Sequence, residues 1–543
     1  MEFKIISIRH QVILFVVAGL LLLTNLDKIE VNIMEARNFI SAREMVQNKE
    51  YLLTTLNNEP RYQKPPLPTW LTAIAGSLSG FESLTVLRLP VVAITFLLVF
   101  IFYSFSKLIG LSPEHSFNNA LILITSFYIF FAGRDNQWDM YTHSLMMVSI
   151  FFLWKLLRED SNTLLYSILG GIFFGFSFLS KGPISVYVLL IPFLISYGLV
   201  YHFSFRKKIL HLSVMLITGL TIGLSWYIYV HIKDPVYFSK IVTHETTNWT
   251  NYEVQPFYYY WNFFLQSGLW AIPSLTALIY PYLKTRVEDL KAYRFAILWT
   301  IISVILMSII PEKKVRYLMP VLIPLALTTG FYIEYLMTRF SKNISRKETI
   351  WIFFSFGIIA LIGFLYPFAW LVLLKETIRE YLLLFILSSS LMYLFAFLII
   401  RGLISGNFRI IFLSMISILV VIVIIVIPIR AKVFINPGFA PAREAQVIAE
   451  RYRIETYRLS DIAPEIVWDF GKPIPLMQKD EDRFLIPDGP SFALIADKAD
   501  SSMIKSRFIK YNIDKKYIIN MNYGLKNKVR YIKDYYILTK KDD

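Results

Sequence analysis

The composition of this 543-residue chain excludes an ordinary soluble protein. Hydrophobic residues make up 56% of the sequence and charged residues only 17%, whereas soluble domains have about 45–50% and about 25%. Aromatic residues reach 16%, which suits a chain that meets lipid interfaces. These proportions exclude a soluble enzyme, a disordered scaffold and a free nucleic-acid-binding protein, and they indicate a polytopic membrane protein.

The chain carries a net charge of +16 and has no cysteine. In a membrane protein, an excess of Lys and Arg is explained first by cytoplasmic loops and anionic lipid headgroups. Without cysteine there is no disulfide, no thiolate metal site and no cysteine nucleophile.

Thirteen segments are long and apolar enough to cross a bilayer, which takes about 20 residues in a helix. The first runs from Ile8 to Leu26, and because no small-x-small cleavage site follows it, we expect an uncleaved anchor. The other twelve lie near residues 85–109, 117–133, 141–157, 163–180, 184–203, 209–231, 260–282, 292–310, 316–339, 349–374, 380–401 and 408–429.

The distribution of charge between the loops predicts the topology. An odd number of spans places the two termini on opposite sides, and the more basic short loops are expected in the cytoplasm. Residues 27–84 and the chain after about residue 430 then lie outside. We expect a membrane domain over residues 1–430, with interfacial helices in its long first loop (27–84), and a small soluble α/β domain over residues 431–543.

The first loop contains two candidate functional residues. Helical spacing predicts an amphipathic helix from Asn32 to Asn48, and Glu35 falls in its first turn, where the helix dipole favours a carboxylate. Glu35 is therefore either a structural charge or a functional one. Lys64 precedes two prolines that fix the backbone, so it is either an anion-binding ammonium at the outer interface or an ordinary snorkelling lysine.

Charged residues gather between the third and fourth spans, on the same outer side. Arg134, Asp135 and Asp139 stand close together in the sequence, and ionisable groups at membrane depth are functional candidates by default. Asp135 and Asp139 share a helix face if the fourth span begins early. Helix capping explains one aspartate, but not Arg134 and both aspartates together.

Further basic residues lie in outer loops, against the positive-inside tendency. Because a topology signal does not explain them, we expect basic side chains from several loops to bind one anion, such as a lipid-linked phosphate. The candidates are Lys64, Arg88, Arg134, Lys181, Lys313, Lys314 and Arg316.

The loop before residue 260 adds His244 and Glu245, followed by an aromatic run that suits an interfacial belt. His244 with Glu245 is either a metal ligand or general base, or, as for most isolated histidines, neither. The sequence has no Walker loop, no dinucleotide-binding glycine pattern and no HExxH, so ATP-driven transport and zinc proteolysis lack their residues.

Taken together, these segments resemble the polyprenyl-phosphate-dependent glycosyltransferases of the GT-C type, in particular the bacterial lipid A aminoarabinose transferases, which are related to protein O-mannosyltransferases. The resemblance covers the whole chain, including the thirteen spans and the C-terminal domain. Its motifs are an acidic residue followed by Arg-x-Phe at 35–39, Ala-Arg-Glu-Met at 42–45, Lys-Pro-Pro-Leu-x-x-Trp at 64–70, Trp-Asp-Met at 138–140, Lys-Gly-Pro at 181–183 and Arg-Tyr-Leu-Met-Pro at 316–320.

The resemblance implies an inverting transfer of an aminoarabinose-like sugar or a hexose from undecaprenyl phosphate to an envelope acceptor such as lipid A, at the periplasmic face of the inner membrane. Lys64, Lys181 and Tyr317 match positions that contact the lipid phosphate, and Asp139 matches the second acidic position. Basic side chains can stabilise the departing phosphate without a metal. Asp139 can then orient the acceptor or stabilise the sugar.

Three departures from the family pattern affect these expectations. Met34 stands where an aspartate usually precedes Glu35, so either Glu35 is the base or the acceptor is already ionised, as a phosphate is. Gln63 stands where the relatives tend to have a glutamate that binds their metal ion. No ligand set can therefore be assigned here to a divalent cation. Thr247 stands where the relatives usually have arginine, so donor or acceptor contacts are expected to differ there.

The predicted site divides by role. The expected catalytic residues are Glu35 and Asp139, the expected phosphate ligands are Lys64, Lys181, Lys313, Lys314, Arg316 and Tyr317, and the further candidates are Arg37, Arg88, Arg134, Asp135, His244 and Glu245. Transfer to protein hydroxyls is the alternative reaction. A lipid-linked-sugar transporter would place charges within its helices near the membrane midplane, and a non-catalytic receptor leaves Lys64 and Asp139 unexplained.

Overall fold

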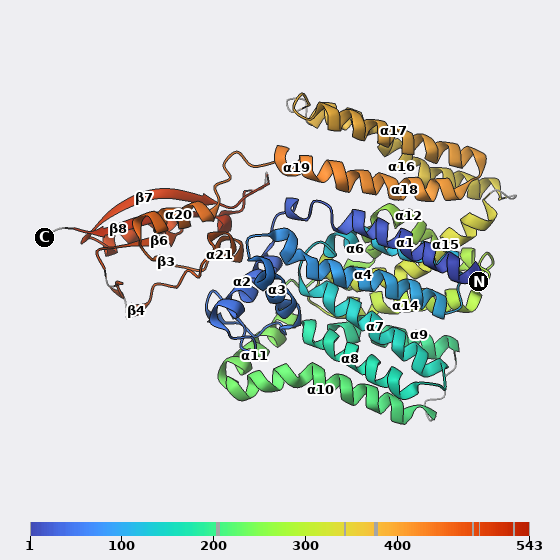
Figure 1. The fold of residues 1–543 in the computed structure, drawn as a ribbon, viewed down its shortest axis with the longest axis horizontal. Coiled ribbons are helices and arrows are strands. Elements are labelled where there is room, and N and C mark those ends of the chain that lie inside the picture. The colour runs from blue at the N-terminus through green and yellow to red at the C-terminus, as the bar shows by residue number, and fades with distance from the viewer. Residues whose placement is uncertain are drawn as a thin grey trace. The chain divides into compact units, whose positions relative to one another are not determined.

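The structure is a computed structural model that divides into two compact units. It describes residues 2–201, 207–340, 344–373, 378–480, 483–487, 489–524 and 527–541. The first unit, here called the helical unit, comprises residues 1–26, 62–68 and 88–429, and the second, here called the mixed unit, comprises residues 27–61, 69–87 and 430–543. Figure 1 shows the helices and strands of both.

Ten helices in the described part of the chain are long and apolar enough to cross a membrane, so the chain is a multi-pass membrane protein. They begin and end close to ten of the thirteen predicted spans. These helices are α1 (Glu2–Leu22), α4 (Leu84–Leu108), α7 (Trp138–Arg158), α8 (Thr163–Lys181), α10 (Ile209–Lys233), α14 (Leu290–Ile309), α15 (Leu322–Arg339) with the preceding 3-10 turn η6 (Val315–Val321), α16 (Arg346–Leu373), α17 (Leu382–Ser405) and α18 (Phe408–Val421), which continues through the π-helical turn η7 (Ile422–Val426) into α19 (Ile427–Val433).

Two of the other three predicted spans are divided into shorter pieces, and the third, 184–203, is a single shorter apolar helix over Val186–Tyr201, with residues 202–203 outside the described part. Residues 117–133 are split at Ser126, whose extended backbone ends one helix before the next begins. Residues 260–282 contain 3-10 turns because Gly268, at φ 64°, interrupts the helix. The elements of these three segments are α5 (Pro113–Thr125), α6 (Phe127–Ala132), the π-helical turn η2 (Val186–Leu190), α9 (Ile191–Tyr201), η4 (Phe257–Tyr260), η5 (Phe263–Trp270), α12 (Ala271–Ala277) and α13 (Tyr280–Leu283).

Helix α8 packs between α7 and α10, and glycines make the contact with α10 unusually close. A Cβ atom added to Gly171 would lie 2.6 Å from the backbone oxygen of Met215, and one added to Gly175 would lie 2.6 Å from the Cβ of Ile222. Gly219 of α10 faces this seam in turn. Small residues at four-residue spacing let two membrane helices approach backbone to backbone, and here they hold α8, which ends at Lys181.

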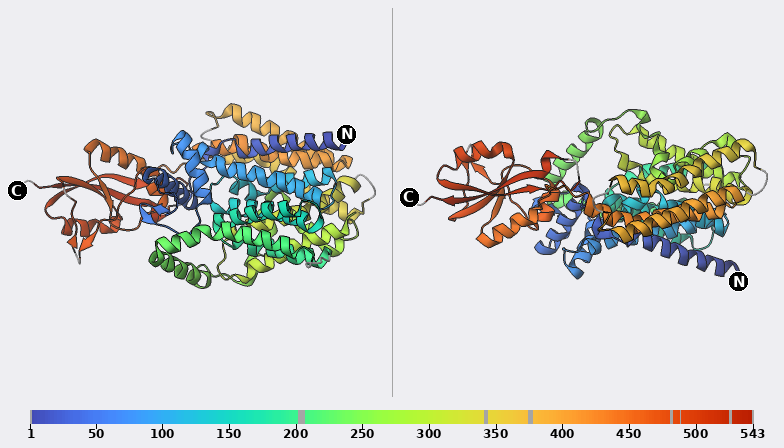
Figure 2. Two further views of the ribbon diagram at one scale, coloured as in Figure 1. Left: turned by 60° about the horizontal axis from the view of Figure 1, so that its bottom comes forward. Right: turned by 90° about the horizontal axis from the view of Figure 1, so that it is seen from above.

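The mixed unit contains a four-stranded sheet with helices on both faces (Figure 2). The strand order is β3-β6-β8-β7, with β3 parallel to β6 and the other pairs antiparallel. The expected C-terminal α/β region is therefore present. The elements are β3 (Thr456–Arg458), β6 (Ser491–Ala496), β7 (Tyr511–Asn520), β8 (Ile532–Lys540), α20 (Ala442–Tyr452), α21 (Pro464–Phe470) and α22 (Ser501–Arg507), together with the short pairs β1 (Thr55–Leu56) with β2 (Glu59–Pro60) and β4 (Lys479–Asp480) with β5 (Arg483–Phe484).

Alternate residues of the central strands fill two separate cores. Ala493 and Ile495 of β6 pack with Ile466 of α21, whereas Leu494, between them, packs on the other face with Ile504 of α22. This alternation is the consequence of the two-residue period of a strand.

The first loop shares the core of the C-terminal sheet, which the sequence did not predict. Helix α2 (Ile33–Asn48) begins at Asn32, whose side chain accepts hydrogen bonds from the backbone of Met34 and Glu35. From this helix, Ile40 packs into the same core as Ile466. Arg43 lies over the ring of Trp468, with its Cζ 5.4 Å from the ring centre. Residues about 420 positions apart thus fold as one unit.

We expect replacement of Asn57 by alanine to destabilise this unit by about 1–3 kcal/mol. The Asn57 amide donates to the backbone oxygen of Ile474 at 2.8 Å and accepts from its backbone nitrogen at 2.6 Å, so its loss leaves two buried groups unpaired. Thermal unfolding of the full chain in detergent would measure the effect. Asn58→Ala is the matched control because both asparagines have φ 59°, while the Asn58 side chain accepts an exposed hydrogen bond from Asn48. Equal losses would contradict the prediction.

Candidate functional site

Asp139 and Lys181 form a buried ion pair where α7 begins and α8 ends. The Lys181 ammonium donates to Oδ1 of Asp139, and both side chains are at most 10% exposed. The two helices are antiparallel neighbours, joined by a hydrogen bond from the Thr142 hydroxyl to the backbone oxygen of Ser177 at 2.9 Å. The first turn of α7 therefore meets the last turn of α8, and two residues that the sequence separates by 42 positions come into contact.

His143 is a buried member of this group that the sequence analysis missed. Its Nε2 lies 4.0 Å from Oδ1 of Asp139, and its side chain is 2% exposed. The signal was its position one helical turn after Asp139, because residues four apart lie on one helix face.

Tyr317 connects this pair to the basic loop before α15. The Lys181 ammonium lies 5.1 Å from the centre of the Tyr317 ring, and the Tyr317 hydroxyl donates to Glu312 at 3.1 Å. Lys314 donates to the same oxygen of Glu312 at 2.9 Å. We call Asp139, His143, Lys181, Lys314 and Tyr317 the α7–α8 site. Arg316 lies beside it, with its guanidinium carbon 5.6 Å from the Tyr317 ring centre.

Neighbouring groups stabilise the positive charge of Lys314. Burial lowers the pKa of this ammonium, but the hydrogen bond to Glu312 and the nearby Tyr317 raise the pKa above its usual value overall. Lys314 therefore remains a cation at neutral pH, as an anion ligand requires.

Lys64 is held by helix α11 (Pro235–Asn251). Its ammonium lies 3.6 Å from Glu245 Oε2. Two residues earlier, the Tyr62 hydroxyl donates to Asp234 at 3.2 Å, and Asp234 caps the start of α11. The structure thus brings together Lys64 and Glu245, both of which were predicted. His244 is exposed, and its Nδ1 lies 3.2 Å from the amide nitrogen of Asn248.

Three predicted anion ligands donate to main-chain carbonyls in the structure. Arg134 donates to the backbone oxygens of Leu21, Thr24 and Asn25, and Arg88 donates to that of Leu26. Both arginines are fully buried. A helix end leaves carbonyl groups unsatisfied and carries a partial negative charge, so Arg134 stabilises the end of α1 and the turn after it, and Arg88 binds the carbonyl of Leu26 just beyond that turn.

Lys313 is the third of these residues. Its ammonium donates to the backbone oxygens of Ile310 at 2.6 Å and Gln255 at 2.9 Å, with Pro311 at 3.4 Å, and burial lowers its pKa. These hydrogen bonds join two loops, and a role of Lys313 as a phosphate ligand stays a prediction.

The remaining candidates are Asp135, Glu35 and Arg37. Asp135 accepts a hydrogen bond from the Gln137 amide at 2.8 Å, and because α7 begins only at Trp138, Asp135 and Asp139 do not share a helix face. Glu35, which is buried, and Arg37 belong to the mixed unit. Among the residues that the structure describes, no group of three or more His, Asp or Glu side chains could hold a metal ion.

Comparison with known proteins supports the resemblance inferred from the motifs. The family model described as dolichyl-phosphate-mannose-protein mannosyltransferase matches residues 63–228, a segment that includes Lys64, Asp139 and Lys181. The undecaprenyl phosphate-alpha-4-amino-4-deoxy-L-arabinose arabinosyl transferase 1 of Proteus mirabilis is 24% identical over 337 residues, 60% of this chain and 59% of that protein. A transferase of the same description from Pseudomonas aeruginosa LESB58 is 26% identical over 282 residues, 50% and 49% of the two chains.

Solved structures extend the similarity to nearly the whole chain. ArnT from Cupriavidus metallidurans in the apo state matches with a TM-score of 0.68 and 16% identity, over 98% of this chain and 97% of that one. The fold is that of ArnT. The same protein bound to undecaprenyl phosphate matches with a TM-score of 0.68 at 15% identity and the same coverage. The expected GT-C type helical fold with a C-terminal sheet is thereby confirmed. The sequence matches to the curated relatives, by contrast, span less than two thirds of their length.

Proposed function

We propose that this chain is an inverting glycosyltransferase that moves an aminoarabinose-like sugar from undecaprenyl phosphate to lipid A or a related envelope glycolipid. The observation that carries the proposal is the contact of Lys181 with both Asp139 and Tyr317, in a chain with the ArnT fold. The names of the curated relatives support the donor, and the family resemblance supports the acceptor.

The lysines suit the chemistry of the leaving group. In an inverting displacement, the acceptor oxygen attacks the anomeric carbon of the sugar, the bond from that carbon to the phosphate oxygen breaks, and the lipid phosphate leaves with an additional negative charge. Ammonium groups that are already in position when the reaction begins stabilise this charge. Lys64, Lys181 and Lys314 supply them, and the Tyr317 hydroxyl supplies a further donor.

Each of these three lysines is paired with a carboxylate in the structure. Lys181 contacts Asp139, Lys64 contacts Glu245 and Lys314 contacts Glu312. A donor phosphate is therefore expected to replace carboxylates as the partner of the lysines. The exchange would free Asp139 to orient the acceptor or to stabilise positive charge on the sugar carbon. Glu35 is the second carboxylate that we propose for catalysis.

The proposed reaction, on the periplasmic side, also implies the orientation of the chain in the inner membrane. Residues 1–430 would form the membrane domain, with loop 27–84 and the domain 431–543 in the periplasm. The greater number of basic residues in the loops on the opposite side supports this orientation.

Mass spectrometry of lipid A from cells with and without the gene tests the reaction directly. Loss of a sugar-sized mass on deletion would identify the acceptor and the class of sugar. An unchanged lipid A would contradict the preferred acceptor. It would favour the alternative, transfer to protein hydroxyls, which agrees with the description of the matching family model as a protein mannosyltransferase. Envelope glycoproteins would then be compared in the same strains.

We expect Lys64→Ala to reduce transfer by about a hundredfold or more, the usual cost of removing one donor from a developing negative charge. The assay is transfer by purified protein with a defined undecaprenyl-phosphate sugar. Lys240→Ala is the matched control, because Lys240 is an exposed lysine on α11, the helix that carries Glu245. Wild-type turnover in Lys64→Ala would remove this lysine from the mechanism.

A further inference from the structure

The Lys314 ammonium lies among two carboxylates and two aromatic rings. It donates to Oε1 of Glu312 at 2.9 Å and lies 3.5 Å from Oε2 of Glu253. The ammonium also lies 4.5 Å from the centre of the Tyr252 ring and 5.7 Å from that of Tyr317, and an aromatic face attracts a cation within about 6 Å. We call Tyr252, Glu253, Glu312 and Tyr317 the ammonium cage.

Two loops that pair through their backbones hold the cage together. Val254 and Glu312 form an antiparallel β-bridge, and the backbone nitrogen of Lys313 donates to the backbone oxygen of Glu253 at 3.2 Å. Glu253 has a positive φ of 47°, which a residue other than glycine keeps only where its surroundings fix it. Carboxylates that lie about 60 positions apart in the sequence therefore reach the same ammonium.

Tyr317 belongs both to the cage and to the α7–α8 site. The Lys181 ammonium lies 5.1 Å from the centre of its ring, and its hydroxyl donates to Glu312 at 3.1 Å. Lys181 and Glu312 thus contact the same six-membered ring. A pyranose is also a six-membered ring, and its positions 1 and 4 lie opposite each other. This spacing suits a sugar whose phosphate lies at Lys181 and whose position 4 reaches the cage.

We propose that the ammonium cage binds the protonated amino group of the donor sugar and thereby selects an amino sugar over a neutral hexose. The inference rests on the proposed function, in which the donor phosphate becomes the partner of the lysines. When Lys314 turns to the phosphate, Glu253 and Glu312 lose their cation. An amino group at position 4 of the sugar would replace it.

A neutral sugar would leave this exchange incomplete. A hydroxyl group at position 4 carries no charge, so both carboxylates would remain without a cation. Glu312 is the more important of the two, because its side chain is 12% exposed whereas that of Glu253 is 46% exposed. Sites that pair their buried polar groups with one substrate discriminate strongly against an analogue that lacks the partner group.

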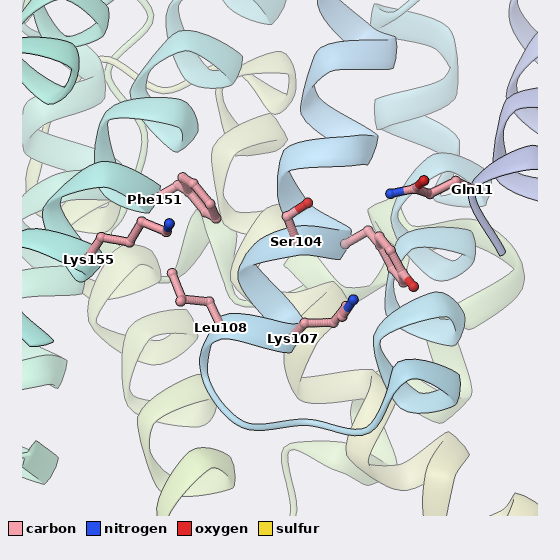
Figure 3. Close-up of a pocket in the computed structure, with 7 residues that line it drawn as sticks. Gln11, Ser104, Lys107, Leu108, Phe151 and Lys155 are labelled. Atoms are coloured by element: carbon pink, nitrogen blue, oxygen red, sulfur yellow. The ribbon is translucent and has the colours of Figure 1, made fainter. Parts of the chain in front are cut away.

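A similar arrangement at the other end of α7 provides a control. The Lys155 ammonium lies 5.0 Å from the centre of the Tyr166 ring, and the Tyr166 hydroxyl donates to Glu159 at 2.7 Å. Lys155 lines an open hollow at this end of the helix (Figure 3). It follows Asp139 by 16 residues on α7, roughly 24 Å along the helix axis, so this arrangement lies far from the proposed reaction.

Kinetics of the purified full chain with two donors test the proposal. Both donors are pentoses linked to undecaprenyl phosphate, one with an amino group and one with a hydroxyl group at position 4. We expect Glu312→Gln to lower the ratio of kcat/KM for the amino donor to that for the hydroxyl donor about tenfold or more, the usual value of a hydrogen bond to a charged group. The glutamine oxygen can still accept from Tyr317.

The ratio separates recognition from a structural role. A variant that only disturbs the site would lower both rates and leave the ratio unchanged, and that result would overturn the proposal. Glu159→Gln is the matched control, because Glu159 also accepts from a tyrosine beside a lysine; its ratio should equal that of the wild type.

Two further results complete the test. If Glu312→Gln does not fold, the exposed Glu253→Gln replaces it, with an expected fall in the ratio of about threefold, and an unchanged ratio overturns the proposal. A wild type that transfers both sugars equally well would overturn the cage and leave the proposed reaction intact. A wild type that transfers neither would contradict the proposed reaction, and the cage with it.

Discussion

Replacement of Asp139 by asparagine is expected to reduce sugar transfer by about 10²–10⁴-fold, the range for loss of a positioned acid or base. Phosphate binding should respond differently. Because a neutral amide at this position no longer competes as an anion for the Lys181 ammonium, undecaprenyl phosphate should bind at least as tightly as to the wild type. A fall in turnover without a fall in donor affinity would distinguish a role in the reaction from a role in donor binding.

The same substitution tests the energetics of the buried pair. Removing one partner leaves the Lys181 ammonium uncompensated, which typically costs about 3–5 kcal/mol. Added undecaprenyl phosphate should restore part of the lost thermal stability, because a ligand that binds only the folded state stabilises it. Asp160→Asn is the control, since Asp160 is an exposed carboxylate at the far end of α7 that pairs with Lys208. Wild-type turnover in Asp139→Asn would exclude Asp139 from the mechanism.

Replacement of Gly175 by leucine is expected to separate α8 from α10. The first added atom alone would lie 2.6 Å from the Cβ of Ile222 and 2.9 Å from the backbone oxygen of Gly219, and backbone cannot move aside as a side chain can. Overpacking of this kind costs about 1–3 kcal/mol and occasionally more. Since α8 ends at Lys181, we expect transfer activity to fall together with the unfolding temperature.

Gly198→Leu provides the comparison. Gly198 also lies within a helix, α9, but an added Cβ meets no atom within 4 Å there. Both substitutions gain the same helix propensity, so the difference between their unfolding temperatures in detergent reports the packing of α8 on α10. Equal stability of the two variants would show that the glycine seam does not hold these helices together.

The chain's amino-acid sequence determined the membrane class and most of the helices. Whether a segment spans a bilayer depends on its own length and hydrophobicity, so ten predicted spans appear as continuous helices. The start of α2 at Asn32 and the C-terminal change to strands are equally local in origin. The breaks in two further predicted spans were not foreseen, because a single residue such as Ser126 or Gly268 changes the backbone without changing the mean hydropathy.

Only the tertiary structure decided which charged side chains lie together. Lys181 and Lys313 look alike in the sequence, each a lysine in an outer loop. One reaches a carboxylate and the Tyr317 ring, and the other is surrounded by main-chain carbonyls. Arg134 is occupied in the same way by the end of α1. The partner of a charge depends on contacts between residues far apart in the chain, and hydrophobic periodicity carries no information about them. The same reason explains why the shared core of α2 and the C-terminal sheet became visible only in the folded molecule.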